Sequence, residues 1–210
     1  MEYIFAKFFE KFPFVHNAIN KRYRKRLKNT NVTLITSNCA GGIIYHWLGL
    51  KFNSPFINLW LTNDDYIRAL ENFDDFINTP ILECKTENVD YPVGVGWGGI
   101  KIYFMHYDTF ENAYSKWKER IERIHRENMC VWFTNWSGDE SILERFNKLP
   151  FKNKIIFVNK NYTEYKSSIY LPGFEKKSGV GQIWKTKNIV GKRYIDQFDF
   201  VEYLNNIRRG

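Results

Sequence analysis

The chain has 210 residues, of which 44% are hydrophobic and 26% are charged, and its formal net charge is +8. This length and composition predict one folded domain with a sizeable core and argue against a disordered chain. The three cysteines are odd in number and lack CxxC spacing, which argues against a disulfide framework and a cysteine-rich zinc site.

The sequence also indicates a cellular compartment and a kind of partner. The start of the chain lacks the basic segment and apolar core of a secretory signal peptide, and no window approaches the roughly 18 apolar residues of a membrane span. We therefore expect a cytoplasmic protein. The positive charge points to an acidic partner, either a phosphorylated small molecule, an anionic lipid head group or nucleic acid. Nucleic acid is the least favoured of these, because no recognition motif accompanies the charge.

Residues 1–28 are predicted to form an amphipathic, basic helical segment that precedes a single α/β domain at residues 29–210. The segment would be one helix, or two helices broken near Pro13. Its phenylalanines recur at spacings of three and four and so share one face: Phe5, Phe8, Phe9 and Phe12. Six of the 31 Lys and Arg residues lie at 21–28. Such a segment either docks on the core with its basic end in solvent or lies in a membrane interface, with lysines at the phosphates.

The first strand is predicted at residues 32–36, and the turn Ser37–Gly42 leads from it into a helix that ends near Gly49. Residues 55–61 form an apolar run that is compatible with a strand. Thr62 then caps a helix that ends at Pro80. Further strands are predicted at residues 81–85, 92–95, 100–105, 129–134 and 154–158.

The second and third of these further strands form a hairpin around Gly96–Gly99. Thr109 starts a helix that runs to about Asn128, Ser137 or Asp139 caps a shorter helix, and residues 196–208 make the last one. Strands that alternate with helices indicate a three-layer α/β fold, with a mainly parallel sheet, helices on both faces and one inserted β-hairpin.

Ligands of open α/β sheets bind beyond the carboxyl ends of the strands, where the turn Ser37–Gly42 lies. Backbone N–H groups at the start of a helix attract phosphate or an oxyanion, and the helix dipole would lower the pKa of a thiol held there. Cys39 is therefore a candidate nucleophile. A ligand-lining role and a buried structural thiol remain open, because the turn matches neither a Walker A loop nor GxGxxG.

Two other segments end strands with polar side chains. His106 could act as an acid or base near neutral pH, and with Cys39 and an orienting carboxylate it would complete a nucleophilic arrangement. Asn135 could hydrogen-bond a hydroxyl-rich ligand. Asp139 could orient a histidine or receive a proton. The alternative is a purely structural role, in which Asp139 caps a helix. The four histidines show no metal-ligand spacing, so neither a metal nor a cofactor is predicted.

Several motifs together resemble one bacterial family. They are Ser37–Gly42 with Tyr45, Leu48–Pro55, Tyr91–Gly94, His106-Tyr107 and Trp117-x-x-Arg120. In this order they are similar to the domain of unknown function nineteen-nineteen, over about residues 20–170. Members of that family are often labelled exopolysaccharide biosynthesis proteins. The resemblance implies a role in making capsule, exopolysaccharide or lipooligosaccharide, and it adds Tyr107, Trp117 and Arg120 to the candidate substrate-binding residues.

We therefore expect a glycosyl or acyl transferase of bacterial surface polysaccharide biosynthesis, with a carbohydrate acceptor. Its anionic donor, a nucleotide sugar or an acyl carrier, would bind at Ser37, Asn38, Gly41 and Gly42. The N-terminal helix would hold the enzyme at the inner face of the membrane. The alternatives are a non-catalytic ligand-binding or regulatory module of the same pathway and a polysaccharide esterase.

Overall fold

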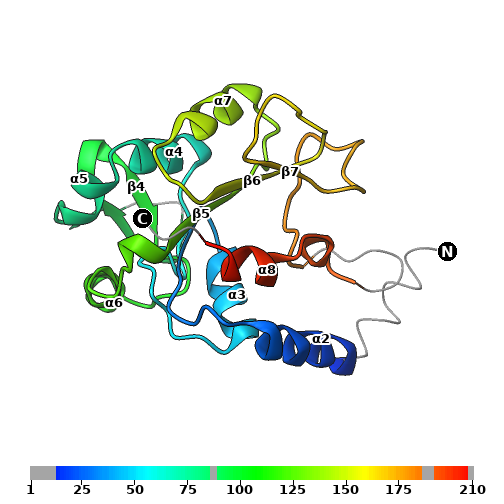
Figure 1. The fold of residues 1–210 in the computed structure, drawn as a ribbon. Coiled ribbons are helices and arrows are strands. Elements are labelled where there is room, and N and C mark those ends of the chain that lie inside the picture. Colours follow the sequence, from blue (N-terminus) through cyan, green and yellow to red (C-terminus); the bar gives the residue numbers. More distant parts are fainter. Residues whose placement is uncertain (1–12, 86–88, 186–191, 208–210) are drawn as a thin grey trace.

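The computed structural model describes residues 13–85, 89–185 and 192–207. In this part of the chain the main sheet has four parallel strands in the order β1-β5-β6-β7 (Figure 1). Their bounds are β1 Thr33–Thr36, β5 Met129–Thr134, β6 Lys154–Val158 and β7 Ser168–Tyr170. A small antiparallel sheet contains β2 Leu82–Glu83, β3 Val93–Val95 and β4 Lys101–Tyr103, in that order. The predicted parallel sheet with an inserted hairpin is thus confirmed.

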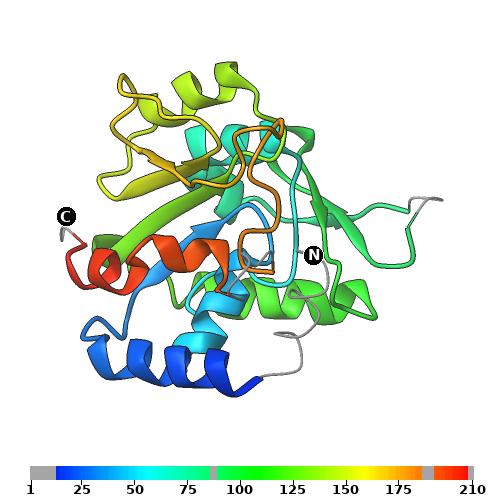
Figure 2. The same cartoon turned by 90° about the vertical axis from the view of Figure 1, so that its right-hand side faces the viewer.

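Helices cover both faces of the main sheet (Figure 1 and Figure 2). One face carries α2 Pro13–Arg26, α3 Ala40–Leu48 and α8 Phe200–Asn205. The other face carries α4 Asn63–Glu71, α5 Phe73–Asn78, α6 Phe110–Ile121 and α7 Glu140–Lys148. Short 3₁₀ turns lie at Trp97–Gly99, Arg126–Asn128 and Tyr194–Gln197. None of the helices that the structure describes combines the length and the apolar character needed to cross a membrane.

The apolar strands supply two cores because successive side chains of a strand point to opposite faces. In β5, Cys130 and Trp132 pack with α2, α3 and α8, whereas Val131 and Phe133 pack with the helices of the other face. Burial on both faces explains why this strand has an almost continuous apolar sequence. The three-layer arrangement expected from the alternation of elements is therefore present.

The N-terminal segment is described only from Pro13 onward, so Phe5, Phe8, Phe9 and Phe12 lie outside the described residues. Pro13 begins α2, a position that suits proline because the first helical N–H needs no partner. The Tyr23 ring meets the Phe200 ring edge-on at 4.7 Å, so α2 docks against α8. Its lysines at 21 and 25 are exposed. The basic end is thus solvated, and the membrane interpretation stays a prediction.

Two predicted helices were too long, and in both cases side chains redirect the backbone. Asn72 separates α4 from α5, because its φ of −129° and ψ of 47° leave the helical region. Its side chain donates to the Arg68 carbonyl, which already accepts the helical bond from the Asn72 N–H. The helix that begins after Thr109 ends at Ile121 instead of Asn128. Beyond that end, the His125 N–H donates to Thr33 Oγ1 at 2.8 Å, which ties the chain to β1.

Three further elements of secondary structure differ from the predictions. Residues 55–61 form no strand and make only an isolated bridge between Trp60 and Tyr103, because the run turns through a left-handed residue, Asn58. The predicted strand at 154–158 is followed in the sheet by β7. The sequence did not reveal β7, because this strand has only three residues and is half-buried. The last helix is a 3₁₀ turn followed by α8, since Phe198 and Asp199 leave the helical conformation.

This topology creates a crevice between the first two strands of the main sheet. After β1 the chain enters α3 on one face, whereas after the neighbouring strand β5 it enters α7 on the opposite face. The two connections diverge, and a crevice of this kind, beyond the carboxyl ends of parallel strands, is where α/β proteins bind ligands.

Candidate active site

A cavity of about 1030 Å³ opens at this crevice. Its wall combines the turn after β1, the turn after β5, the loop before α4, the end of the hairpin and the segment around residue 184. The residues that line it include Ser37, Asn38, Cys39, Gly42, His46, Phe52, Asn58, Trp60, Thr62, Asn63, His106, Trp136, Ser137, Trp184 and Lys185. Segments from most of the chain therefore meet in one site.

Hydrogen bonds hold the turn after β1 in place. The Thr36 hydroxyl donates to the Asn38 carbonyl at 2.8 Å and accepts from the Gly41 N–H at 3.2 Å. The Asn38 side chain donates to Thr134 Oγ1 at 2.6 Å and accepts from the Ala40 N–H at 3.1 Å. The turn is thus tied both to its own helix and to the end of β5, and Cys39 stands at the first position before α3.

The two glycines of the turn serve different purposes. A Cβ on Gly41 would lie 2.7 Å from Thr36 Oγ1, so Gly41 permits the close approach of α3 to β1 and is itself buried. A Cβ on Gly42 would lie 3.3 Å from Ile57 Cγ2, and Gly42 lines the cavity. Gly41 is consequently a packing residue, whereas Gly42 contributes its backbone to the wall.

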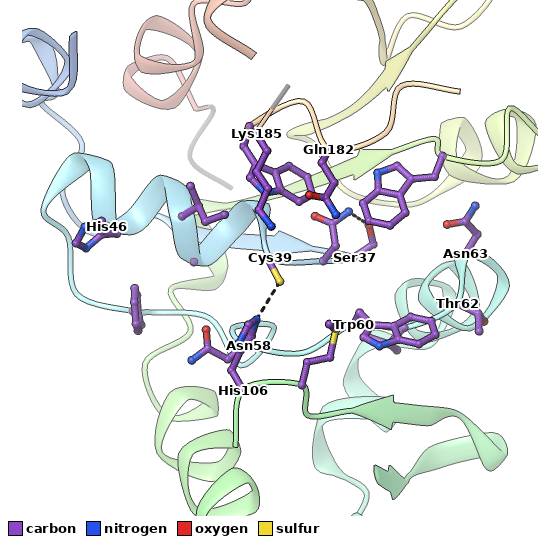
Figure 3. Close-up of a pocket in the computed structure, with 18 of the residues that line it drawn as sticks. Ser37, Cys39, His46, Asn58, Trp60, Thr62, Asn63, His106, Gln182 and Lys185 are labelled. Carbon is purple, nitrogen blue, oxygen red and sulfur yellow. Dashed lines mark hydrogen bonds between the residues drawn. The ribbon is translucent and has the colours of Figure 1, made fainter. Parts of the chain in front are cut away.

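The central feature of the cavity is the contact between Cys39 and His106. Cys39 Sγ lies 3.5 Å from His106 Nε2, although the two residues are 67 positions apart in the sequence (Figure 3). This is hydrogen-bonding distance for a thiol and an imidazole nitrogen. His106 is exposed and Cys39 half-buried, so both reach the cavity. The pair has the geometry of a nucleophile beside its general base.

Burial raises the pKa of the Cys39 thiol above its ordinary value, while the nearby Lys185 cation and the thiol's own backbone N–H lower it in part. The net direction is upward, opposite to the lowering that the helix dipole alone predicted, because desolvation of the thiolate is the larger effect. Cys39 therefore rests as a thiol. It would become a nucleophile by passing its proton to His106 during attack, in general-base catalysis.

Arg120 holds together the two loops that flank the pair. Its Nη1 donates to the Tyr107 hydroxyl at 2.7 Å and to the Ile57 carbonyl at 3.1 Å, and its guanidinium lies over the Phe52 ring at 5.4 Å. Tyr107 follows His106 directly. Ile57 precedes Asn58, the one non-glycine residue with positive φ (63°) in the part of the chain that the structure describes. Arg120 and Tyr107 are thus placed to position the site.

The remaining predicted site residues lie outside the cavity wall. Trp117 is buried in the core against Phe56 and Phe76. Asn135 is buried in the turn after β5, where its Oδ1 accepts from the Gly138 N–H at 3.0 Å. Asp139 caps α7 by accepting a hydrogen bond from the Ser141 N–H at 2.9 Å, which is the structural role that the sequence also allowed. These side chains shape the turns around the crevice.

The cavity wall also contains residues that the sequence analysis did not select. Trp60, Trp136, Trp184 and Lys185 are the most prominent of them. Lys185 is the one Lys, Arg, Asp or Glu side chain in the described part of the wall. Among the residues that the structure describes, no group of three or more His, Cys, Asp or Glu side chains could hold a metal ion. Lys185 lies in a basic stretch of the sequence with Lys176 and Lys177, whereas nothing local distinguished these tryptophans from core residues.

Fold and site together define a three-layer α/β protein with a cysteine–histidine pair in a cavity at the carboxyl edge of its parallel sheet. The chain belongs to the family DUF1919, a domain of unknown function, which matches residues 11–205. It is 39% identical over 204 residues to a protein of Haemophilus influenzae described as uncharacterized. That similarity covers 93% of this chain and 98% of the relative.

Proposed function

We propose that this protein is a thiol-dependent acyltransferase, with Cys39 as nucleophile and His106 as general base. The observation that carries the proposal is the 3.5 Å contact between Cys39 Sγ and His106 Nε2 inside the cavity at the start of α3. A neutral thiol beside an imidazole is the arrangement used to form thioester intermediates. Of the two transfer reactions expected from the sequence, acyl transfer suits this pair better than glycosyl transfer, because a thiol activated by a neighbouring base readily takes up an acyl group as a thioester and releases it again.

The reaction would proceed in two balanced steps. In the first, Cys39 Sγ attacks the donor carbonyl carbon while its proton passes to His106 Nε2, and the leaving group departs with that proton. This produces an acyl-thioester on Cys39. In the second, His106 takes the proton of an acceptor hydroxyl as its oxygen bonds to the acyl carbon. The carbon–sulfur bond breaks, and the proton returns to the thiol.

The start of α3 supports this chemistry with a backbone donor. Of the first-turn amides, Ala40 N–H donates to Asn38 Oδ1 and Gly41 N–H donates to Thr36 Oγ1. The Gly42 N–H has no acceptor in the part of the chain that the structure describes. Because Gly42 lines the cavity close to Cys39, this amide is the proposed donor to the oxyanion of each tetrahedral intermediate.

A covalent labelling experiment tests the proposal. With p-nitrophenyl acetate as acyl donor, we expect a burst of nitrophenol and one acetyl group on the peptide that contains Cys39, detected by mass spectrometry. Cys39→Ala should abolish both signals. His106→Ala should slow the burst at least about 100-fold, the usual contribution of a general base. Cys84→Ser, which removes a half-buried thiol outside the cavity wall, serves as the matched control.

Two results would reject the acyltransferase. One is acetylation of Cys84 alone, and the other is a burst that His106→Ala leaves unchanged. If acetate is released steadily and an added sugar does not take up the acetyl group as an ester, water is the acceptor. That result would identify an esterase.

We place the reaction in the synthesis of a bacterial surface polysaccharide, in line with the label that members of the family often carry. The basic α2 supports a position near an anionic membrane surface, since Lys21, Arg22 and Lys25 are exposed. The test in cells is complementation. If polymer synthesis survives both Cys39→Ser and His106→Ala undiminished, the protein has a non-catalytic role in that pathway.

A further inference from the structure

Beside the proposed nucleophile, one side of the cavity carries two tryptophans that are each backed by another aromatic ring. The Trp60 ring stacks on Tyr103 with centroids 4.1 Å apart and planes within 9°. The backbones of the same two residues exchange hydrogen bonds of 3.0 and 3.1 Å. Tyr103 therefore covers one face of the indole and holds it rigidly, which leaves the opposite face for the cavity that Trp60 lines.

Trp136 is the second of these rings. It stacks on Trp184 at 6.1 Å with 29° between the planes, and Trp184 is buried in the same wall. Trp136 itself is 42% exposed, one of three large hydrophobic side chains that are exposed in the described part of the chain. An exposed indole fixed against a buried one is poorly explained by core packing, and it suits a ligand that covers its open face.

Neutral polar groups surround the two indoles. Asn63 Nδ2 donates to Ser137 Oγ at 3.0 Å, which links the start of α4 to the turn that carries Trp136, and Thr62 is exposed beside Asn63. All three of these polar residues line the cavity. In Figure 3, Trp60, Thr62 and Asn63 lie on one side of the Cys39–His106 pair, and His46 lies on the other side. The groups around Trp60, Thr62 and Asn63 are thus aromatic or hydrogen-bonding and carry no charge, whereas Lys185 follows Trp184 in the wall and acts on Cys39.

We propose that Trp60 and Trp136 form an acceptor subsite for a neutral sugar ring. The proposal rests on the acyltransferase proposed above, since it names the hydroxyl compound that the acyl-enzyme would meet. The apolar C–H face of a pyranose can stack on an indole, and its hydroxyls would bond to the amide of Asn63 and the hydroxyl of Thr62. Ser137 Oγ already bonds to Asn63, Asn135 and Asp139, so it holds Asn63 in place instead of binding the sugar. A stacked nucleotide would require cations for its phosphates, and Lys185 is the single one in the described wall.

The test is a binding measurement on the Cys39→Ala variant, which cannot turn over. Chitotetraose, maltotetraose and UMP are titrated by calorimetry and tryptophan fluorescence. We expect at least one of the two neutral oligosaccharides to bind, with an affinity that does not depend on salt. Trp136→Ala and Trp60→Leu should each weaken this binding about tenfold, which corresponds to about 1.4 kcal/mol. Trp97→Leu is the matched control, because Trp97 is half-buried and lies outside the cavity wall.

Three outcomes would overturn the subsite. They are no binding of either oligosaccharide, binding that both tryptophan variants leave unchanged, and binding of UMP alone that these variants abolish. Trp136 is exposed, so Trp136→Ala should fold even if Trp60→Leu does not. The acetylation assay on the unaltered protein separates the two proposals. Sugar binding without acetylation rejects only the acyltransferase, and acetylation without sugar binding rejects only the subsite.

Discussion

Replacing Gly41 or Gly42, two adjacent glycines at the start of α3, with alanine should change the stability of the protein to very different degrees. In Gly41→Ala the new Cβ would lie 2.7 Å from Thr36 Oγ1 and 3.2 Å from Thr36 Cγ2. Thr36 cannot move aside, because it is 1% exposed and its hydroxyl makes hydrogen bonds to Asn38 and Gly41. In Gly42→Ala the nearest atom is Ile57 Cγ2 at 3.3 Å, so a shift of only a few tenths of an ångström relieves the contact, and no hydrogen bond of the Ile57 side chain opposes it.

The expected magnitudes follow from these contacts. Overpacking costs about 1–3 kcal/mol, and each disturbed hydrogen bond costs about 1 kcal/mol. Replacing a helical glycine returns at most about 1 kcal/mol. Gly41→Ala should therefore lower the free energy of unfolding by about 2 kcal/mol. The free energy of unfolding of Gly42→Ala should stay within about 0.5 kcal/mol of that of the unaltered protein. The cost of the tight contact with Ile57 and the higher helix propensity of alanine nearly cancel.

Urea unfolding followed by tryptophan fluorescence measures both variants. A double-mutant cycle identifies the cause, because Thr36→Ala removes the atoms that the Gly41 methyl would strike. The two substitutions should be coupled by at least about 1 kcal/mol, so that the double variant is more stable than additivity predicts. Equal unfolding midpoints for the two glycine variants, or strict additivity in the cycle, would refute this explanation of the turn.

Two further predictions concern the chemistry of the cavity. In a Cys84→Ser background, alkylation of Cys39 by iodoacetamide should accelerate with rising pH through a midpoint above that of an ordinary cysteine, because burial raises the pKa of this thiol. Lys185→Ala should move the midpoint still higher, and a midpoint below the ordinary value would contradict the proposed resting thiol. Arg120→Met should lower the free energy of unfolding by about 1–3 kcal/mol, because it leaves the Ile57 carbonyl and the Tyr107 hydroxyl without their donor. It should also slow acetylation of Cys39, and an unchanged acetylation rate would show that this link does not position His106.

Local signals in the sequence were sufficient for most of the secondary structure. Apolar runs bounded by polar residues located the strands at 32–36, 129–134 and 154–158 within one or two residues. Thr62 and Thr109 accept hydrogen bonds from N–H groups three residues later, as expected of helix caps. Such features depend on residues only a few positions apart, which is why a single chain reveals them.

The sequence alone determined the three-layer α/β fold, and it predicted the turn Ser37–Gly42 as the place where chemistry could occur. Only the tertiary structure decided that His106 meets Cys39, because the two residues are 67 positions apart and come together only when the end of the hairpin packs beside the start of α3. The structure also decided between interpretations that the sequence had left open, since Trp117 lies in the core and Asp139 caps α7. The direction of the Cys39 pKa was decided in the same way, since burial raises it and Cys39 packs against a core that includes segments distant in the chain.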